Sequence, residues 1–265
     1  MGNKPNTCAP LVAAAAVSVL LLSACVGPFE PDDGFFPGEH SREISFSGYR
    51  GTPESLPDNM FVTATNSAGD EIGPDFAPFS GVHTFQQETL DPNDSFDGFG
   101  AFTSGDGRYS FGIREHGDLD VQDSRLFYAY TNTSGTTITG FTVSYNVEVW
   151  YLGQRNNRIR LKYNDSATGY ASLASIASTN NPLSGFLSGG LSLDGRSPQH
   201  SKRITATFAL QSLLDDAGNR AGINRLQHGD TGYLRWQYSN GVVVGGDLRS
   251  ALAISDIRVT PIFAP

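Results

Sequence analysis

Apolar and polar side chains alternate along several stretches of the chain, most clearly over residues 138–151. The apolar members recur at every second position: Phe141, Val143, Tyr145, Val147, Val149 and Tyr151. This period of two is typical of a β-strand with one buried face. The next alternating stretch, 158–164, predicts a hairpin with the first. Its register sets Glu148 opposite Arg160 and Trp150 opposite Arg158.

Similar short runs of β-branched and aromatic residues, separated by Gly, Asn and Asp clusters, fill most of the chain after residue 42. We expect strands at 43–47, 61–65, 108–114, 125–131, 138–151, 158–164, 171–178, 202–210, 232–238 and 251–261. One helical turn is expected within 210–216 and an exposed Ser/Gly-rich loop at 182–199. The predicted fold class is all-β, a two-sheet antiparallel β-sandwich of jelly-roll type forming one domain over residues 43–265.

The first 24 residues have the pattern of a targeting segment. A short polar stretch containing Lys4 precedes an apolar run at 11–22, and Leu22-Ser23-Ala24-Cys25 follows. The run is shorter than the roughly 20 helical residues that cross a bilayer, and it has the length of a signal-peptide core. Because Leu-Ser-Ala-Cys resembles the lipobox of bacterial lipoproteins, we expect a lipoprotein signal peptide at 1–24 and lipid attachment at Cys25. An ordinary signal peptide with an incidental cysteine is the alternative.

Residues 25–42 are expected to form a flexible tether, since the stretch after Cys25 holds three prolines and three glycines without any period. Val26, rather than Asp, after the cysteine resembles outer-membrane sorting, so we expect an outer-membrane lipoprotein on the periplasmic or cell-surface side. Cys8 would leave with the signal and Cys25 would carry lipid, so no disulfide is expected.

The charge balance is acidic, with 18 Lys and Arg against 27 Asp and Glu. Such a balance argues against nucleic acid and other anionic polymers as partners, because these bind clustered cations. The expected partners are the membrane, through the N-terminal lipid, and a glycan or an envelope protein.

Catalytic and zinc motifs are not evident. The five histidines, His40, His83, His116, His200 and His228, fall in predicted loops or in the tether, and none has a Gly-x-Ser-x-Gly partner or a second His at zinc-binding spacing. Glu148 and Asp256 are the best candidates for a glycosidase-type carboxylate pair, because they lie on predicted strands. The expected ion pair between Glu148 and Arg160 argues against that role.

Calcium is the one metal that the sequence suggests, since oxygen ligands gather in two loops. The first contains Asp91, Asn93, Asp94 and Asp97, and the second contains Asp118, Asp120 and Asp123. An EF-hand starting at Asp91 would place Gly and Glu where Phe96 and Phe102 stand. The loops therefore predict either a structural Ca²⁺ of another type or solvated acidic turns, and no other cofactor is expected.

Several motifs together resemble a β-sandwich domain of exported bacterial proteins, many of them carrying PEP-CTERM sorting tails or attached to surface hydrolases. They are Gly107–Gly112, the Asn132–Tyr145 segment leading to Glu148 and Trp150, Tyr233-Leu-Arg-Trp236, and the closing stretch from Asp247 to Asp256. The resemblance implies a fold similar to the jelly rolls of carbohydrate-binding modules and leaves the biochemical role open. Ser255 stands where that family usually has an acid, which weakens a metal site there.

Sugar binding requires exposed aromatic rings beside polar side chains. Trp150 and Tyr151 end a predicted strand next to a loop bearing Gln154 and Asn156, so these four residues are the predicted ligand contacts. Core packing is the alternative, and it is favoured for Trp236 and Tyr238. We therefore predict a non-catalytic cell-surface lipoprotein that binds a glycan. The alternatives are a structural or adhesive envelope protein and, ranked last, a glycan hydrolase or lyase.

Overall fold

The computed structural model describes residues 40–66, 68–73, 79–85, 98–115, 121–164, 176–180, 191–215, 217–239 and 248–265. The chain divides into a unit of residues 1–35 and a unit of residues 36–265, and the fold below is that of the second. Cys25, most of the expected tether and the calcium candidates Asp91, Asn93, Asp94 and Asp97 lie outside the described residues. Within the described part, no helix is long and apolar enough to cross a membrane.

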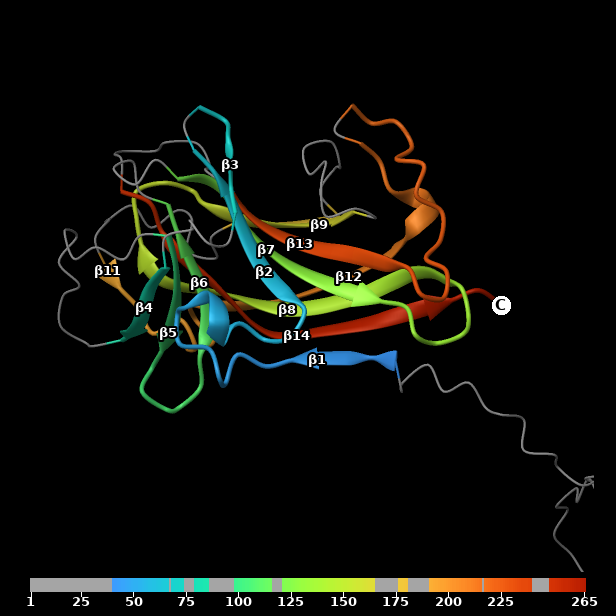
Figure 1. The fold of residues 1–265 in the computed structure, drawn as a ribbon. Helices are drawn as coiled ribbons and strands as arrows, with labels where there is room; N and C mark the ends of the chain where they lie inside the picture. Colours follow the sequence, from blue (N-terminus) through green and yellow to red (C-terminus); the bar gives the residue numbers. More distant parts are fainter. Residues whose placement is uncertain are drawn as a thin grey trace, which may run out of the picture. The chain divides into compact units, whose positions relative to one another are not determined.

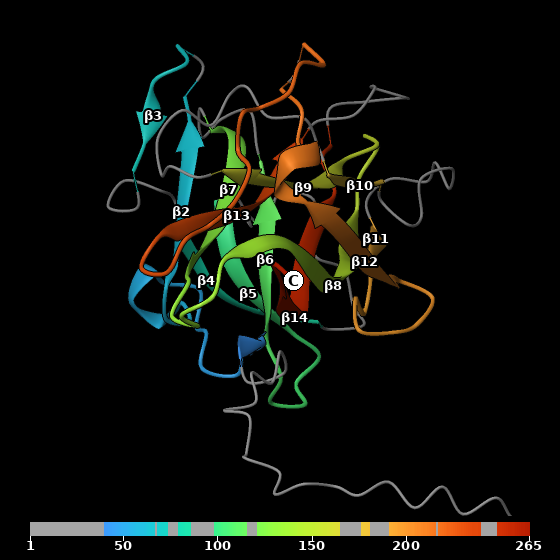
Figure 2. The same cartoon turned by 90° about the vertical axis from the view of Figure 1, so that its right-hand side faces the viewer.

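Two β-sheets make up the domain, and Figure 2 shows them as separate layers, with β9 and β13 in one and β8 and β14 in the other. The strands of sheet A are β1 (Arg42–Ile44), β4 (Phe79–Thr84), β5 (Gly98–Thr103), β6 (Ser110–Arg114), β8 (Ile138–Leu152), β11 (Leu191–Ser192), β12 (Ser201–Ala209) and β14 (Ala251–Phe263). Those of sheet B are β2 (Met60–Thr65), β3 (Glu71–Ile72), β7 (Gln122–Thr131), β9 (Arg158–Asn164), β10 (Ala177–Asn180) and β13 (Thr231–Ser239). The all-β sandwich expected from the sequence is confirmed.

The strand order places sequence-distant segments side by side (Figure 1). Sheet A runs β11-β8-β14-β6-β5-β4, with β1 beside β14 and β12 beside β8, and sheet B runs β10-β9-β13-β7-β2-β3. Neighbouring strands are antiparallel except for β4 and β5, which are parallel. The predicted helical turn is present as a 3₁₀ turn, η5 (Leu210–Ser212), and a second such turn, η2 (Pro53–Ser55), precedes β2.

The core lies between the sheets and is built from the alternating positions. The predicted apolar face of β8 is buried there from Phe141 to Val149, with every second side chain at 0% exposure. Trp236 of β13 faces it, its ring meeting that of Tyr145 edge-on at 5.7 Å. Trp236 and Tyr238 are each 0% exposed, which confirms their predicted place in the interior.

A β-bulge at the end of β8 breaks the alternation. Ala251 of β14 pairs with Tyr151, while the next residue, Leu252, pairs with Val149, so Trp150 is an extra residue between them. A bulge of this kind turns the following side chain to the other face. Tyr151 consequently packs with Trp150 outside the main core, and not with the apolar face to which the sequence assigned it.

The predicted hairpin between residues 138–151 and 158–164 is wrong, because β8 belongs to sheet A and β9 to sheet B. Glu148 pairs with Ser201 of β12, and Arg160 pairs with Gln237 of β13. Alternation shows which face of a strand is buried, but a sandwich core can match two apolar faces across its layers as well as within one sheet.

Each predicted strand overlaps a strand of the structure, but β3, β4, β5 and β11 were not expected. β5 reads Gly-Phe-Gly-Ala-Phe-Thr, a glycine-rich composition that favours a loop. β11 lies inside the expected loop 182–199, of which residues 182–190 are outside the described part. β1 begins at Arg42, within the expected tether, and Phe46 and Tyr49 follow it with their rings packed against Phe111.

Candidate functional site on the outward face of sheet B

Trp150 and Tyr151 do not present their rings to solvent, since each is only 2% exposed. The Trp150 ring stacks on Phe102 with centroids 5.3 Å apart, and a Cβ on Gly195 would come within 2.5 Å of the indole nitrogen. Tyr151 lies under the guanidinium of Arg114, 4.6 Å from the ring centre. In this structure neither ring is available to stack on a sugar.

Gln154 and Asn156 lie half-buried in the connection between β8 and β9. The backbone N–H of Gln154 donates to the carbonyl of Leu248 at 2.7 Å, which fixes this connection to the segment before β14. The four predicted contact residues therefore sit in two settings, a buried aromatic pair and a partly buried connection. They do not make an open binding platform.

The candidate carboxylates Glu148 and Asp256 meet through one hydroxyl. Ser255 Oγ lies 2.5 Å from Glu148 Oε1 and 3.4 Å from Asp256 Oδ2. Glu148 is 1% exposed, and its second oxygen accepts a hydrogen bond from Trp150 Nε1 at 2.9 Å. The Glu-x-Trp motif thus places a buried carboxylate acceptor beside the indole N–H of Trp150. The predicted ion pair between Glu148 and Arg160 does not form, because Arg160 is on the other sheet.

The described histidines stay apart from one another. His83 Nε2 lies 3.1 Å from the carbonyl oxygen of Ser80, and burial lowers the pKa of this histidine. His200 Nδ1 lies 2.8 Å from the carbonyl oxygen of Asp194, and His228 Nδ1 accepts the backbone N–H of Gly135. No three His, Cys, Asp or Glu residues in the described ranges are grouped so as to hold a metal ion. The calcium candidates of the first loop, together with Asp118 and Asp120 of the second, lie outside those ranges, and Asp123 lies within them.

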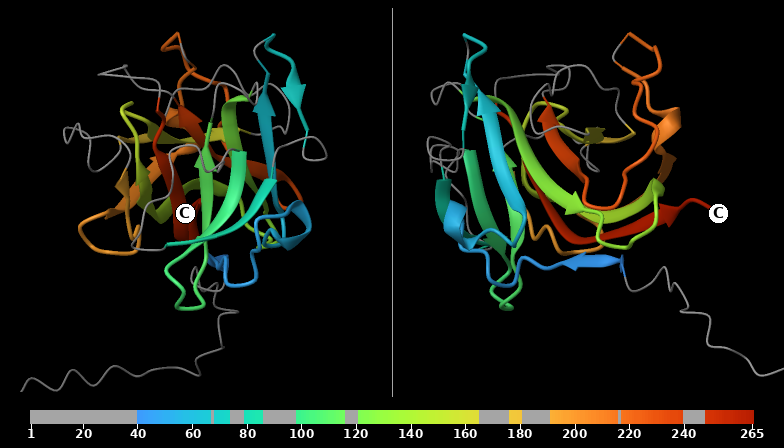
Figure 3. Two further views of the ribbon diagram at one scale, coloured as in Figure 1. Left: turned by 90° about the vertical axis from the view of Figure 1, so that its left-hand side faces the viewer. Right: turned by 45° about the vertical axis from the view of Figure 1, so that its right-hand side comes forward.

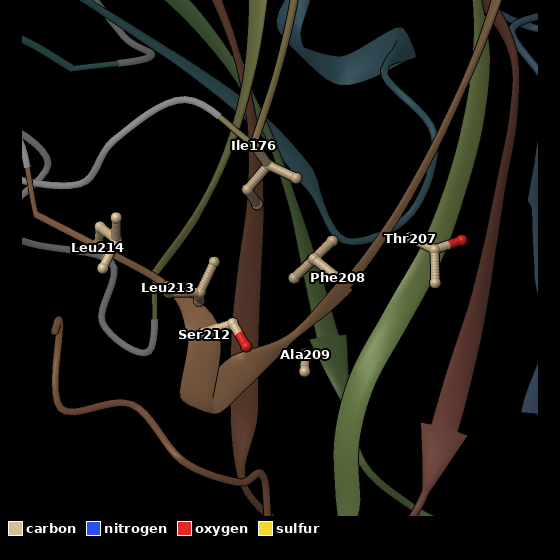
Figure 4. A pocket seen from close by; sticks show the side chains of 7 residues that line it. All are labelled: Ile176, Thr207, Phe208, Ala209, Ser212, Leu213 and Leu214. Carbon is tan, nitrogen blue, oxygen red and sulfur yellow. The ribbon is translucent and has the colours of Figure 1, made fainter. Parts of the chain in front are cut away.

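An apolar cavity of about 390 Å³ lies at one edge of the sandwich, beside β12 and η5. Figure 4 shows Ile176, Phe208 and Leu213 gathered around it, and the remaining lining residues are Thr207, Ala209, Ser212 and Leu214. Its polar side chains are two hydroxyls, and no charged side chain lines it. The cavity could accept an apolar group but offers little to orient a polar ligand.

A different set of residues, mostly polar and aromatic, gathers on the outward face of sheet B, which we call the sheet-B face. These side chains alternate with the core residues of β2, β7, β13 and β9, and they lie opposite one another across neighbouring strands. One row is Phe61, Phe127, Arg235 and Lys162; a second is Thr63, Arg125, Gln237 and Arg160; the flanking rows add Ala129, Tyr233 and Asn164 on one side and Ser239 and Arg158 on the other. Figure 3 shows the β2–β3 hairpin and the segment around η5 projecting at opposite ends of the domain.

Aromatic rings occupy one side of the sheet-B face. Phe61 and Phe127 are stacked, with centroids 4.8 Å apart and ring planes 2° from parallel. Tyr233 meets Phe61 edge-on at 6.3 Å. Phe127 is buried, whereas Phe61 and Tyr233 are half-buried and keep part of their surface accessible.

Cations occupy the other side of the sheet-B face. Arg125, Arg158, Arg160, Lys162 and Arg235 account for five of the chain's 18 Lys and Arg residues. Asp123 stands at their margin, held with a positive φ of 50°, 3.9 Å from Arg125 and 3.1 Å from the side-chain amide of Gln237. The cations are therefore unevenly distributed, although the chain as a whole is acidic.

Buried polar atoms without hydrogen-bond partners also lie on the sheet-B face. They are Thr63 Oγ1, Gln237 Oε1, Ser239 Oγ and Arg158 Nε, each without a partner in the part of the chain that the structure describes. Leaving one such group unsatisfied costs about 1–3 kcal/mol, so native proteins rarely keep several together. Their grouping marks this face as a place where a ligand could supply the missing hydrogen bonds.

The sequence did not predict this face, although the alternating pattern of two of its strands was evident. The alternation in 158–164 puts Arg158, Arg160 and Lys162 on one side of a strand, and that in 232–238 does the same for Arg235 and Gln237. What the pattern could not give is that these two strands are neighbours in one sheet, with Arg235 opposite Lys162.

No protein-family model and no curated protein matches the chain. Among solved structures, a cleaved adhesin domain of Lys-gingipain is similar over 84% of this chain and 99% of its own, with 14% identity and a TM-score of 0.39. Another adhesin domain of Lys-gingipain, from Porphyromonas gingivalis, covers 83% and 97% with 8% identity and a TM-score of 0.38. A carbohydrate-binding module that recognises mannan covers 83% and 96% with 13% identity and a TM-score of 0.35. At these identities and TM-scores the similarities carry no conclusion about this chain.

Proposed function

We propose that this protein is a non-catalytic glycan-binding module and that the sheet-B face is its binding surface. The observation that carries the proposal is the combination of half-buried rings at Phe61 and Tyr233 with unpartnered buried polar atoms at Thr63, Gln237 and Ser239. A sugar ring has an apolar face that packs on an aromatic side chain, and hydroxyls that both donate and accept hydrogen bonds. Such a ligand would use both features at once.

A binding role, and not a hydrolytic one, agrees with the state of the carboxylates. Glu148 is 1% exposed and is engaged by Trp150 and Ser255. It also belongs to sheet A, on the opposite layer from the sheet-B face. A glycosidase needs two carboxylates facing one bound sugar, an arrangement that Glu148 and Asp256 do not offer to a ligand on sheet B.

A glycan-array screen of the full-length chain, solubilised in detergent, tests the proposal in calcium and again with chelator. We expect specific binding, and a loss of roughly tenfold or more in affinity for Tyr233→Ala, since a stacked ring contributes on the order of 1 kcal/mol beyond its buried area. Tyr109→Ala is the matched control, because Tyr109 is also half-buried but lies outside the sheet-B face, under Arg50. A blank array in both conditions, or equal losses for the two variants, would refute the proposal.

We also propose that the module is displayed as an outer-membrane lipoprotein acylated at Cys25, on the basis of Leu22-Ser23-Ala24-Cys25. Metabolic labelling with a palmitate analogue should mark the natural chain and not Cys25→Ser. Cys8→Ser is the control, because Cys8 lies within the expected signal. Labelling that persists in Cys25→Ser would exclude this site.

A further inference from the structure

The sheet-B face sets cations beside cations. Arg235 lies directly opposite Lys162 across β13 and β9, and Arg158 and Arg160 follow on the same face of β9. Like charges directly opposite one another destabilise a sheet. Arg235 and Lys162 are only 3% and 5% exposed, whereas Arg158 and Arg160 are half-buried and keep part of their surface accessible.

The cations lie on the outward faces of β9 and β13, on the opposite side from the core. The inner faces of β9 and β13 already bury Ile159, Leu161, Leu234 and Trp236 in the core, and the outward positions need only tolerate a pleated surface. The outward face of β8 and β12 shows the alternative, since Thr142 and Thr207 face each other there through a 2.9 Å hydroxyl contact.

Arg158 adds a local observation. Its Nε atom is buried and has no hydrogen-bond partner in the described ranges. Burial and the neighbouring charge of Arg160 lower the pKa of Arg158. An oxyanion placed between these two arginines would relieve both effects, because a guanidinium offers a planar pair of donors that matches a carboxylate or sulfate.

We infer that the glycan bound by the sheet-B face is anionic, carrying carboxylate or sulfate groups that Arg158 and Arg160 recognise. This inference rests on the proposed function, and it names the class of ligand for the same site. Phe61 and Tyr233 would receive the sugar rings, and the half-buried Arg158 and Arg160 would receive the charged substituents. The ring-binding side and the charge-binding side of one face thereby divide the recognition between them.

Two matched polymer pairs test the inference by biolayer interferometry with the full-length chain. Dextran and dextran sulfate differ in sulfate alone, and fully methyl-esterified and free polygalacturonate differ in carboxylate alone. We expect binding to a charged member of at least one pair, at least tenfold weaker binding to its neutral counterpart, and weakening with salt. The pair that responds identifies which oxyanion is recognised.

The variant Arg158→Gln/Arg160→Gln should lose at least tenfold in affinity for the charged polymer while Lys202→Gln/Arg258→Gln keeps it. The second variant is the control because it also removes two positive charges, from exposed positions on sheet A. Circular dichroism checks that both variants fold. Equal losses in the two variants would indicate general charge attraction and overturn the inference. Binding of neutral polymers that depends on Tyr233 but not on Arg158 and Arg160 would overturn it and leave the proposed function standing. Absence of binding to every glycan would remove both.

Discussion

Replacing Thr63 by Val should stabilise the protein while weakening its binding of glycan. Thr63 lies on β2 with only 4% of its surface exposed, and its hydroxyl has no hydrogen-bond partner among the described residues. Val has nearly the same outline and a good preference for strands. The substitution removes the buried hydroxyl and leaves the packing of β2 against β7 unchanged.

The gain expected is the penalty of one unsatisfied buried group, about 1–3 kcal/mol. For a domain of this size each kcal/mol corresponds to a rise in Tm of about 2–4 °C. Urea denaturation should show a higher midpoint at unchanged slope, since the surface exposed on unfolding hardly changes. The same variant should bind its glycan more weakly, because one hydrogen bond to a sugar hydroxyl is lost.

Thr205→Val is the matched control, on the exposed outward side of β12, and it should change stability by less than about 0.5 kcal/mol. A lower urea midpoint for Thr63→Val would show that the hydroxyl is satisfied in the unliganded protein. In that case the clustered unpartnered atoms would no longer point to a ligand.

Two other perturbations follow from the same structure. Burial raises the pKa of Glu115 from its usual 4.5 to about 7, against the opposing effects of the Ser124 backbone N–H and Arg249, so the folded protein holds a proton that the unfolded chain releases. The contribution of this proton to stability is complete below about pH 4.5 and disappears as the pH rises through 7. The unfolding free energy of the natural protein should therefore fall by about 3 kcal/mol between pH 4.5 and 8 because of Glu115. This fall should be absent in Glu115→Gln and present in Glu43→Gln, whose substitution is at an exposed position. Gly112→Ala should destabilise the protein by about 1–3 kcal/mol in urea, because its Cβ would lie 2.1 Å from the Phe102 ring. Gly48→Ala, with nothing within 4 Å, should be nearly neutral, and equal effects of the two would contradict the crowding argument.

The fold was predictable from local alternation, while the neighbour relations were not. The period of two from Phe141 to Val149 correctly gave the buried face of β8, because burial of one face is a property of a single strand. It could not show that β8 pairs with β12 and β14, which follow it by more than 45 residues, or that a bulge turns Tyr151 outward.

The predicted ligand contacts at Trp150 and Tyr151 differ from the structure for the same physical reason. Trp150 looked exposed because it shares a strand face with Thr142 and Asn146, but its neighbours across the sheet bury it, Phe102 above all. The cations of β9 were expected opposite Glu148 and Trp150 in a hairpin, whereas β9 pairs with β13 and sets Lys162 opposite Arg235. Charge and aromatic clusters that span several strands are set by topology, which a single sequence does not reveal.

The short strand β1 has a mechanical consequence. It is attached to β14 by three residue pairs, from Arg42 opposite Val259 to Ile44 opposite Ile257, and it is the first described strand that a pulling force from the N-terminal side would reach. The hydrogen bonds of these three pairs should break at low force. Further detachment of the chain would then require separating the rings of Phe46 and Tyr49 from Phe111. Single-molecule force spectroscopy should therefore record a small extension, from detachment of β1, before the larger extension from unfolding of the domain. Detachment of β1 would relieve part of the applied force before the rest of the sandwich unfolds.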